Sequence, residues 1–267
     1  MGLEAGKISN LLVMGKSGAG KQPRIDVLVR EFDLDQLSTG DLFRTYLKKF
    51  EEVDFEGDLS SFYDEETDSF VSDEEILWSL GPVAKWDDPQ GVVLGLKAKY
   101  FVESGKFVPD SITNEMFGTV FKSKECRGWV LDGYPRTVAQ TENLLNLVVE
   151  SGSNIDAVLI VEGDDDEIVA RTTGRRICPN CKKVYHIEFK PPSKEGNCTH
   201  CGTPVIRRSD DSEEKIRSRL EEFHTKTELS IKFLEHQGIP IVKVPGNLSE
   251  YSREIVRKSV MDAFDAI

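Results

Sequence analysis

The sequence has no apolar run that could cross a membrane, since none of its hydrophobic stretches approaches the roughly 20 residues that a spanning helix needs. It leaves no room for a targeting segment, because its first apolar stretch, residues 11–14, leads directly into a glycine-rich loop. No run of lysine and arginine suggests a basic face, which disfavours nucleic acid as a partner. Hydrophobic residues at 39% and charged residues at 30% are typical of a globular protein, so we expect a cytoplasmic protein without a membrane partner.

Basic residues are missing altogether from residues 51–75, where the chain carries twelve acids and neither lysine nor arginine. This stretch holds −12 of the net charge of −13, so the rest of the chain is close to neutral. Such a charge density favours a flexible, solvated loop. An alternative is a docking element for a protein partner, because aromatic side chains lie among or just after the acids: Phe55, Phe62, Tyr63, Phe70 and Trp78.

Cysteines are few, but four of the five form two pairs with a metal-ligand spacing. Each pair has two intervening residues, and sixteen residues separate the pairs; the four are Cys178, Cys181, Cys198 and Cys201. Two such knuckles complete a tetrahedral sulfur site for one structural zinc ion. A pair of disulfides is the alternative, which the lack of a secretory signal disfavours. The fifth, Cys126, precedes an apolar strand, and we expect it to be a buried thiol.

Apolar and helical segments alternate along much of the chain. Short aliphatic runs predict strands at 11–14, 129–131, 157–161 and 241–244, and helical patterns lie at 25–32, 137–149 and 213–236. This alternation predicts an α/β fold with a parallel sheet flanked by helices. Two regions break the pattern, and we interpret 44–110 and 174–211 as lobes inserted into a core of residues 1–43, 111–173 and 212–267.

The first predicted strand ends in a glycine-rich loop, residues 15–21, that closes on Lys21. Such a loop between a strand and a helix turns backbone N–H groups toward one point and binds phosphate, although an ordinary turn is the alternative. The pattern departs from the usual motif at Gln22 and Pro23, where serine or threonine is expected after the lysine. Proline removes one N–H, and a lost hydrogen bond to a charged oxygen costs roughly 1.5–3 kcal/mol. We therefore expect weakened phosphate binding.

Several further motifs follow in order from about residue 8 to residue 246. They are LSTGDLFR at 37–44, LDGYPRT at 131–137, GRR at 174–176, and Asp210–Asp211 leading to Arg217 and Arg219. Together they resemble the adenylate kinase family, and the cysteine segment resembles the zinc-bearing lid of its long-form members. The resemblance implies a P-loop nucleoside monophosphate kinase fold and reversible phosphoryl transfer, MgATP + AMP to two ADP.

The resemblance also implies a role for individual residues. The phosphate-clamping catalytic positions are Lys21, Arg136, Arg175, Arg208 and Arg219. The ATP-binding positions are Gly15, Gly18, Gly20, Lys21, Gln22, Arg171 and Arg175. The AMP-binding positions are Thr39, Arg44, Val108, Gly133, Arg136 and Gln140. Asp132 matches the carboxylate that holds Mg²⁺ through water. A solvated or salt-bridged role is the alternative for Arg171 and Arg176, and we expect structural roles for all four histidines.

Against the family pattern, the acidic stretch belongs to an insertion at about 51–88 in the monophosphate-binding lobe. Together with Gln22 and Pro23, it leaves two alternatives open. One is a catalytically impaired relative that acts as a nucleotide-sensing or interaction module. The other is a related nucleoside monophosphate kinase with another donor, such as GTP. We expect a monomer whose ligands are ATP, AMP and ADP.

Overall fold

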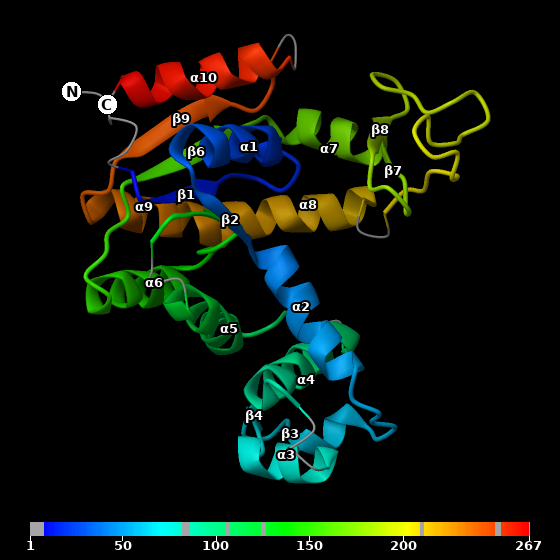
Figure 1. Ribbon diagram of the computed structural model, residues 1–267, viewed down its shortest axis with the longest axis vertical. Coiled ribbons are helices and arrows are strands. Elements are labelled where there is room, and N and C mark those ends of the chain that lie inside the picture. The colour runs from blue at the N-terminus through cyan, green and yellow to red at the C-terminus, as the bar shows by residue number, and fades with distance from the viewer. Residues whose placement is uncertain are drawn as a thin grey trace.

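A five-stranded parallel sheet forms the centre of the protein (Figure 1). The computed structural model describes residues 8–81, 86–104, 107–123, 127–208, 211–248 and 252–266. The sheet order is β2-β5-β1-β6-β9. Its strands are β1 (Asn10–Met14), β2 (Asp35–Ser38), β5 (Trp129–Asp132), β6 (Ala157–Glu162) and β9 (Ile241–Pro245). The parallel sheet expected from the sequence is confirmed. The polar edge strand β2 lacks an aliphatic run and was not predicted.

The central strand β1 is buried at every position because helices cover both faces of the sheet. Leu11 and Val13 pack in one apolar cluster, whereas Leu12 and Met14 pack in the other. Successive strand residues point to opposite faces, so this alternation assigns each cluster to one side. The carboxyl ends of β1, β5 and β6 meet at one edge, where a ligand site is expected in an open α/β sheet.

The two faces carry different helices (Figure 1). One face is covered by α1 (Lys21–Phe32), α7 (Asp165–Thr173) and α10 (Arg253–Asp265). The other is covered by α5 (Asp110–Ser123), α6 (Val138–Glu150) and α9 (Glu228–His236). Helix α8 (Glu213–Glu222) continues through the π-helical segment η3 (Phe223–Thr227) into α9. The helix predicted at 213–236 is therefore one continuous helix that contains a π turn in its middle.

Helix α1 begins earlier than the sequence pattern indicates, at Lys21 rather than residue 25. Pro23 is therefore the third helical residue, not the first. Gln22 is also helical, although the residue before a proline is normally biased away from that conformation. The helix tolerates this proline because the N–H groups of its first turn have no partner within the helix.

The acidic insertion is folded, and the expectation of a flexible loop is wrong for its described residues. Its elements are η1 (Leu59–Phe62), β3 (Tyr63–Asp64), β4 (Ser69–Phe70) and α3 (Asp73–Leu80). They pack with α2 (Thr39–Glu51) and α4 (Pro89–Glu103) to form the lobe at the bottom of Figure 1. Tyr63 packs against Tyr100 with ring centroids 4.6 Å apart, and Phe62 is buried. Among the insertion's aromatic residues named above, only Trp78 is largely exposed to solvent, at 85%.

The cysteine segment projects from the core at the right of Figure 1, apart from the lobe at the bottom. It contains the antiparallel pair β7 (Arg175–Ile177) and β8 (Val184–His186). Cys126 and Asp210 lie outside the described residues, so the predictions for them stay predictions. Among the described residues, none of the helices is both long and apolar enough to span a membrane.

Candidate active site at the carboxyl edge of the sheet

The glycine-rich loop lies between β1 and α1, as the sequence predicts for a phosphate-binding loop. Gly20 adopts φ +89° and caps α1, a backbone conformation that residues with a Cβ rarely take. A Cβ at Gly15 would lie 2.5 Å from the carbonyl oxygen of Val161, so the loop sits tightly against β6. Lys21 folds back over the loop and donates to the carbonyl oxygens of Gly15 at 3.1 Å and Lys16 at 3.2 Å.

Three of the five predicted catalytic cations line one cavity of about 260 Å³ beside this loop: Lys21, Arg136 and Arg219. Burial lowers the pKa of Lys21; the charge of Asp132 opposes this shift and that of Arg136 adds to it. Burial likewise lowers the pKa of Arg136. Lys21 is half-buried and Arg136 keeps contact with solvent, and an anion in the cavity would compensate the partial desolvation that lowers both pKa values.

Asp132 ends β5 at the same edge of the sheet. Its backbone oxygen accepts from the Thr39 hydroxyl at 3.0 Å, which ties the start of α2 to the sheet. Burial raises the pKa of its carboxyl, while the neighbouring Lys21 and Arg136 oppose that shift. Gln36 links this carboxylate, at 3.5 Å, to Gln22, whose amide donates to Gln36 at 2.8 Å.

Helices α2 and α6 and the end of β5 supply the predicted AMP-binding residues. Gly133 adopts φ +80°, and a Cβ there would lie 3.1 Å from both Thr39 Oγ1 and Arg136 Nη2, so these three residues meet. Gln140 is buried; its amide donates to Asp110 at 2.7 Å and accepts from the Arg136 N–H at 2.8 Å. In contrast, the structure leaves two predicted residues apart from this group: Arg44 is exposed and pairs with Asp41, and Val108 is half-buried.

Two arginines that the sequence left open both bind backbone oxygens. Arg171 donates to the Gly18 oxygen in the glycine-rich loop of residues 15–21, which we call the P-loop, and, at 2.8 Å, to Asn247. Arg176 donates to the oxygens of Thr173 at 3.1 Å and Arg175 at 2.7 Å. Arg171 therefore joins the P-loop to α7 and to the loop after β9, whereas Arg176 braces the turn that leads into the cysteine segment.

Comparison with known proteins agrees with this geometry. The family model for adenylate kinase matches residues 79–239, more than half of the 267-residue chain. The chain belongs to the adenylate kinase family. The adenylate kinase of Geobacillus sp. (strain WCH70) is 34% identical over 230 residues, covering 86% of this chain and 88% of the relative. That of Thermoanaerobacter sp. (strain X514) is 32% identical over 254 residues, covering 94% of this chain and 98% of the relative.

In this member of the adenylate kinase family, the two remaining predicted catalytic arginines lie away from the cavity. Arg175 pairs with the fully buried Asp211, with its Nη2 2.5 Å and its Nε 2.9 Å from the carboxylate oxygens. Arg208 is exposed. A bidentate pair to a buried carboxylate fixes the base of the lid, since breaking it would leave a charge buried.

The four predicted metal ligands are brought together. Their Sγ atoms all lie within 4.8 Å of one another, so the cluster could hold a metal ion. Cys178 Sγ lies 3.4 Å from Cys201 Sγ, and Cys181 Sγ lies 3.5 Å from Cys198 Sγ; all four cysteines are free, so the alternative of two disulfides is wrong. The Tyr185 hydroxyl lies 3.1 Å from Cys198 Sγ, and hydrogen bonding with Thr203 lowers the pKa of Cys201 to about 6. These contacts favour thiolates, the form that binds metal, at Cys198 and Cys201, whereas burial and the neighbouring cysteine sulfurs raise the pKa of Cys181 to about 12.

Sequence reasoning missed several residues at the site. Arg24 is fully buried and donates to the oxygens of Gly20 at 3.0 Å and Pro245 at 2.6 Å, so it joins the residue that caps α1 to the end of β9. Glu222 and Phe223 line the cavity beside Arg219. In the lid, His186 stacks on Phe189 with ring centroids 4.5 Å apart. No motif marks these residues: the bond from Arg24 to Pro245 depends on the fold, and the three-residue spacing of His186 and Phe189 is not specific to any site.

Proposed function

We propose that the protein is an active adenylate kinase that transfers a phosphoryl group from MgATP to AMP, giving two ADP. One observation carries the proposal: Lys21, Arg136 and Arg219 come from three separate elements and converge on one cavity beside the P-loop. Phosphoryl transfer demands positioning and charge neutralisation more than covalent chemistry. A cavity lined by three cations, at the edge where the carboxyl ends of the parallel strands meet, supplies that environment.

The roles follow from the placement of each group. Lys21 and the P-loop N–H groups would hold the donor's terminal phosphates, and Arg136 would contact the acceptor phosphate. Thr39, Gly133 and Gln140 would bind the acceptor nucleoside, because all three lie next to Arg136. Asp132 would hold Mg²⁺ through water, since its carboxylate lies beside Lys21 and carboxylate oxygens suit this ion. When bound, Mg²⁺ would neutralise phosphate charge.

Arg175 and Arg208 would join the cavity only when the lid closes over the nucleotides. Closure would expel water and strengthen every charge interaction inside. The cysteine cluster supports a structural zinc ion, because four thiolates fill its tetrahedral positions and leave none for a reacting water. Its task would be to keep the small β7–β8 lobe folded.

The rival function is an impaired relative that serves as an interaction module, and Pro23 is the observation that favours it. Proline removes one N–H from the anion cradle at the start of α1. A coupled assay of ADP formation distinguishes the two functions. We expect turnover that Lys21→Ala lowers by about a hundredfold or more. Turnover no higher than that of the Lys21→Ala variant would eliminate the enzyme, and replacing ATP by GTP or AMP by another monophosphate would identify the donor and the acceptor.

The cytoplasmic location, the monomeric state and a protein partner for the insertion stay predictions. The partner prediction now centres on Trp78, because the other aromatic residues named for the insertion pack within the lobe.

A further inference from the structure

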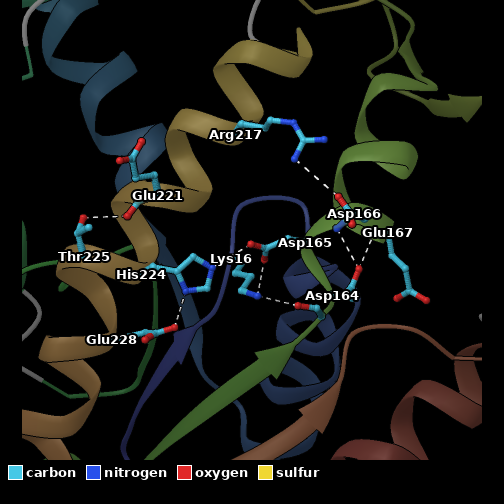
Figure 2. Close-up of polar contacts among 11 residues, drawn as sticks. Lys16, Asp164, Asp165, Asp166, Glu167, Arg217, Glu221, His224, Thr225 and Glu228 are labelled. Carbon is cyan, nitrogen blue, oxygen red and sulfur yellow. Dashed lines mark hydrogen bonds and ion pairs between the residues drawn. The ribbon is translucent and has the colours of Figure 1, made fainter.

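A polar bridge joins the P-loop to the π turn, outside the cavity described above (Figure 2). Lys16, the second residue of the loop, donates to the Gly163 oxygen at 3.0 Å and lies 2.5 Å from the carboxylate of Asp165. The other Asp165 oxygen lies 3.0 Å from His224 Nε2. His224 Nδ1 in turn lies 2.6 Å from Glu228. The bridge therefore links the P-loop, the first residue of α7, segment η3 and the start of α9.

The π turn gives this bridge a route to the cavity. Segment η3 places Phe223 and Thr227 on the cavity wall, next to Arg219 of α8. His224, adjacent to Phe223, faces Asp165 instead (Figure 2). A π turn holds one more residue per hydrogen-bonded ring than an α-helix and often occurs at functional sites. A displacement of His224 would therefore move the neighbouring cavity residues with it.

Both bonds of His224 require a charged ring. A neutral imidazole has one N–H, whereas the imidazolium has two and can donate to both carboxylates at once. The hydrogen bond to Asp165, followed by that to Glu228, raises the pKa of His224 above its ordinary value of 6.5. Two cations lie close to His224 and its partners. Lys16 of the bridge also binds Asp165, and Arg217 of α8 lies 3.7 Å from Asp166.

We propose that His224, as an imidazolium held between Asp165 and Glu228, is a positioning residue for phosphoryl transfer that keeps the π turn and Arg219 aligned with the P-loop. The proposal rests on the proposed kinase function. His224 touches no reacting atom; it acts through the wall of the cavity. Because its pKa is raised in the fold, the bridge is complete below pH 6.5 and is lost as the pH rises through the raised value.

The test compares kcat and KM for ADP formation from pH 6 to pH 9 in the wild type and three variants. His224→Gln keeps the ring's approximate size without its charge, and we expect kcat about tenfold lower near pH 6.5, with a flat profile and little change in the KM for AMP. His224→Arg offers a permanent cation to both carboxylates, and we expect it to restore kcat and stay flat. His236→Gln is the matched control, because exposed His236 contacts the Lys232 oxygen at the far end of α9.

A second readout follows the position of the π turn without turnover. In NMR titrations, the Phe223 ring resonances should shift with the same midpoint as His224, and Glu228→Gln should lower both midpoints. If His224→Gln matches the wild type in kcat and in pH profile, the proposal is overturned. If the wild type turns over no faster than Lys21→Ala, the kinase function fails instead. In that case, Phe223 ring resonances that do not shift as His224 titrates would still contradict the proposed link between His224 and the π turn.

Discussion

At the scale of single residues, this kinase departs from its family pattern at Gln22 and Pro23, in the region that we propose binds the donor phosphates. Pro23 is the third residue of α1, so its missing N–H costs the helix no internal bond. The same N–H is one of the few that could point at a phosphate. Gln22 directs its side chain away from the loop, to Asp26 at 2.9 Å and Gln36 at 2.8 Å. The loop keeps its shape and Lys21, but offers an anion fewer donors.

Restoring those donors should strengthen binding of the donor nucleotide. We expect the double variant Gln22→Gly/Pro23→Thr to bind MgATP about tenfold more tightly, because one charge-assisted hydrogen bond contributes roughly 1.5–3 kcal/mol. Isothermal titration calorimetry measures this directly. Pro23→Ala is the matched control: it restores the N–H without a hydroxyl and should recover part of the gain. Unchanged affinity in both variants would mean that other groups already replace the lost donor.

At the scale of elements, the two inserted lobes are stabilised by different means. The monophosphate lobe has an apolar interior, in which Phe62 and Ile76 of the insertion join the main core cluster. The lid's described core consists of little more than Tyr185 and two cysteines, with Cys181 and Val205 packed against it. A segment with so little buried apolar surface depends on cross-links or a metal for its fold.

If the insertion contributes to the fold, substituting a buried aromatic residue in it should destabilise the protein far more than substituting an exposed one. Phe62→Ala should destabilise the protein by about 3–5 kcal/mol, the usual cost of removing a buried aromatic side chain. Trp78→Ala is the matched control and should change the free energy of unfolding by less than about 0.5 kcal/mol, because this side chain is exposed. Urea denaturation gives both values. Equal, small effects would indicate that the insertion adds nothing to the fold.

For the lid, removing the metal should unfold the lobe without removing a reacting group. We expect a chelator to lower the midpoint of thermal unfolding and to reduce kcat, and zinc to restore both. Cys178→Ser should lower the midpoint in the same way and no longer respond to the chelator, because one of the four ligands is lost. A metal analysis that finds no zinc in the purified protein, together with an unmoved midpoint, would contradict this prediction.

At the scale of the whole molecule, the lid and the monophosphate lobe project from the core in different directions, to the right and to the bottom of Figure 1. Arg175 is held by Asp211 and Arg208 is exposed, so the full set of predicted catalytic cations is not assembled in this arrangement. If the two arginines act in the cavity, as proposed above, we expect the lid to move, because both belong to the cysteine segment.

Filling both nucleotide sites should therefore compact the protein. A fully compact chain of this length has a radius of gyration of about 18 Å, and we expect the free protein to exceed this value. Adding ADP with magnesium should lower the radius measured by small-angle X-ray scattering. Lys21→Ala, which retains the lid but loses a phosphate contact, should contract less at the same ADP concentration. An unchanged radius in the wild type would mean that the two lid arginines act without closure.

The sequence by itself determined the features that depend on local spacing. The strands β1, β5, β6 and β9, the P-loop and the cysteine knuckles each lie within a short window, so hydrophobic alternation and fixed residue intervals were enough to place them. The same reasoning misjudged the insertion, since its high charge outweighed aromatic residues whose partners, such as Tyr100 and Phe101, come later in the chain.

Only the tertiary structure decided which side chains meet across long separations. His224 finds Asp165 from 59 residues away, and Arg24 reaches Pro245 across 221 residues. Such contacts arise where packed elements cross, and the burial of apolar faces sets those crossings. The sequence therefore defined the chemical groups available to this kinase. Packing decided which of them line the cavity, which bind the backbone of the P-loop, and which lie in the lid outside the cavity.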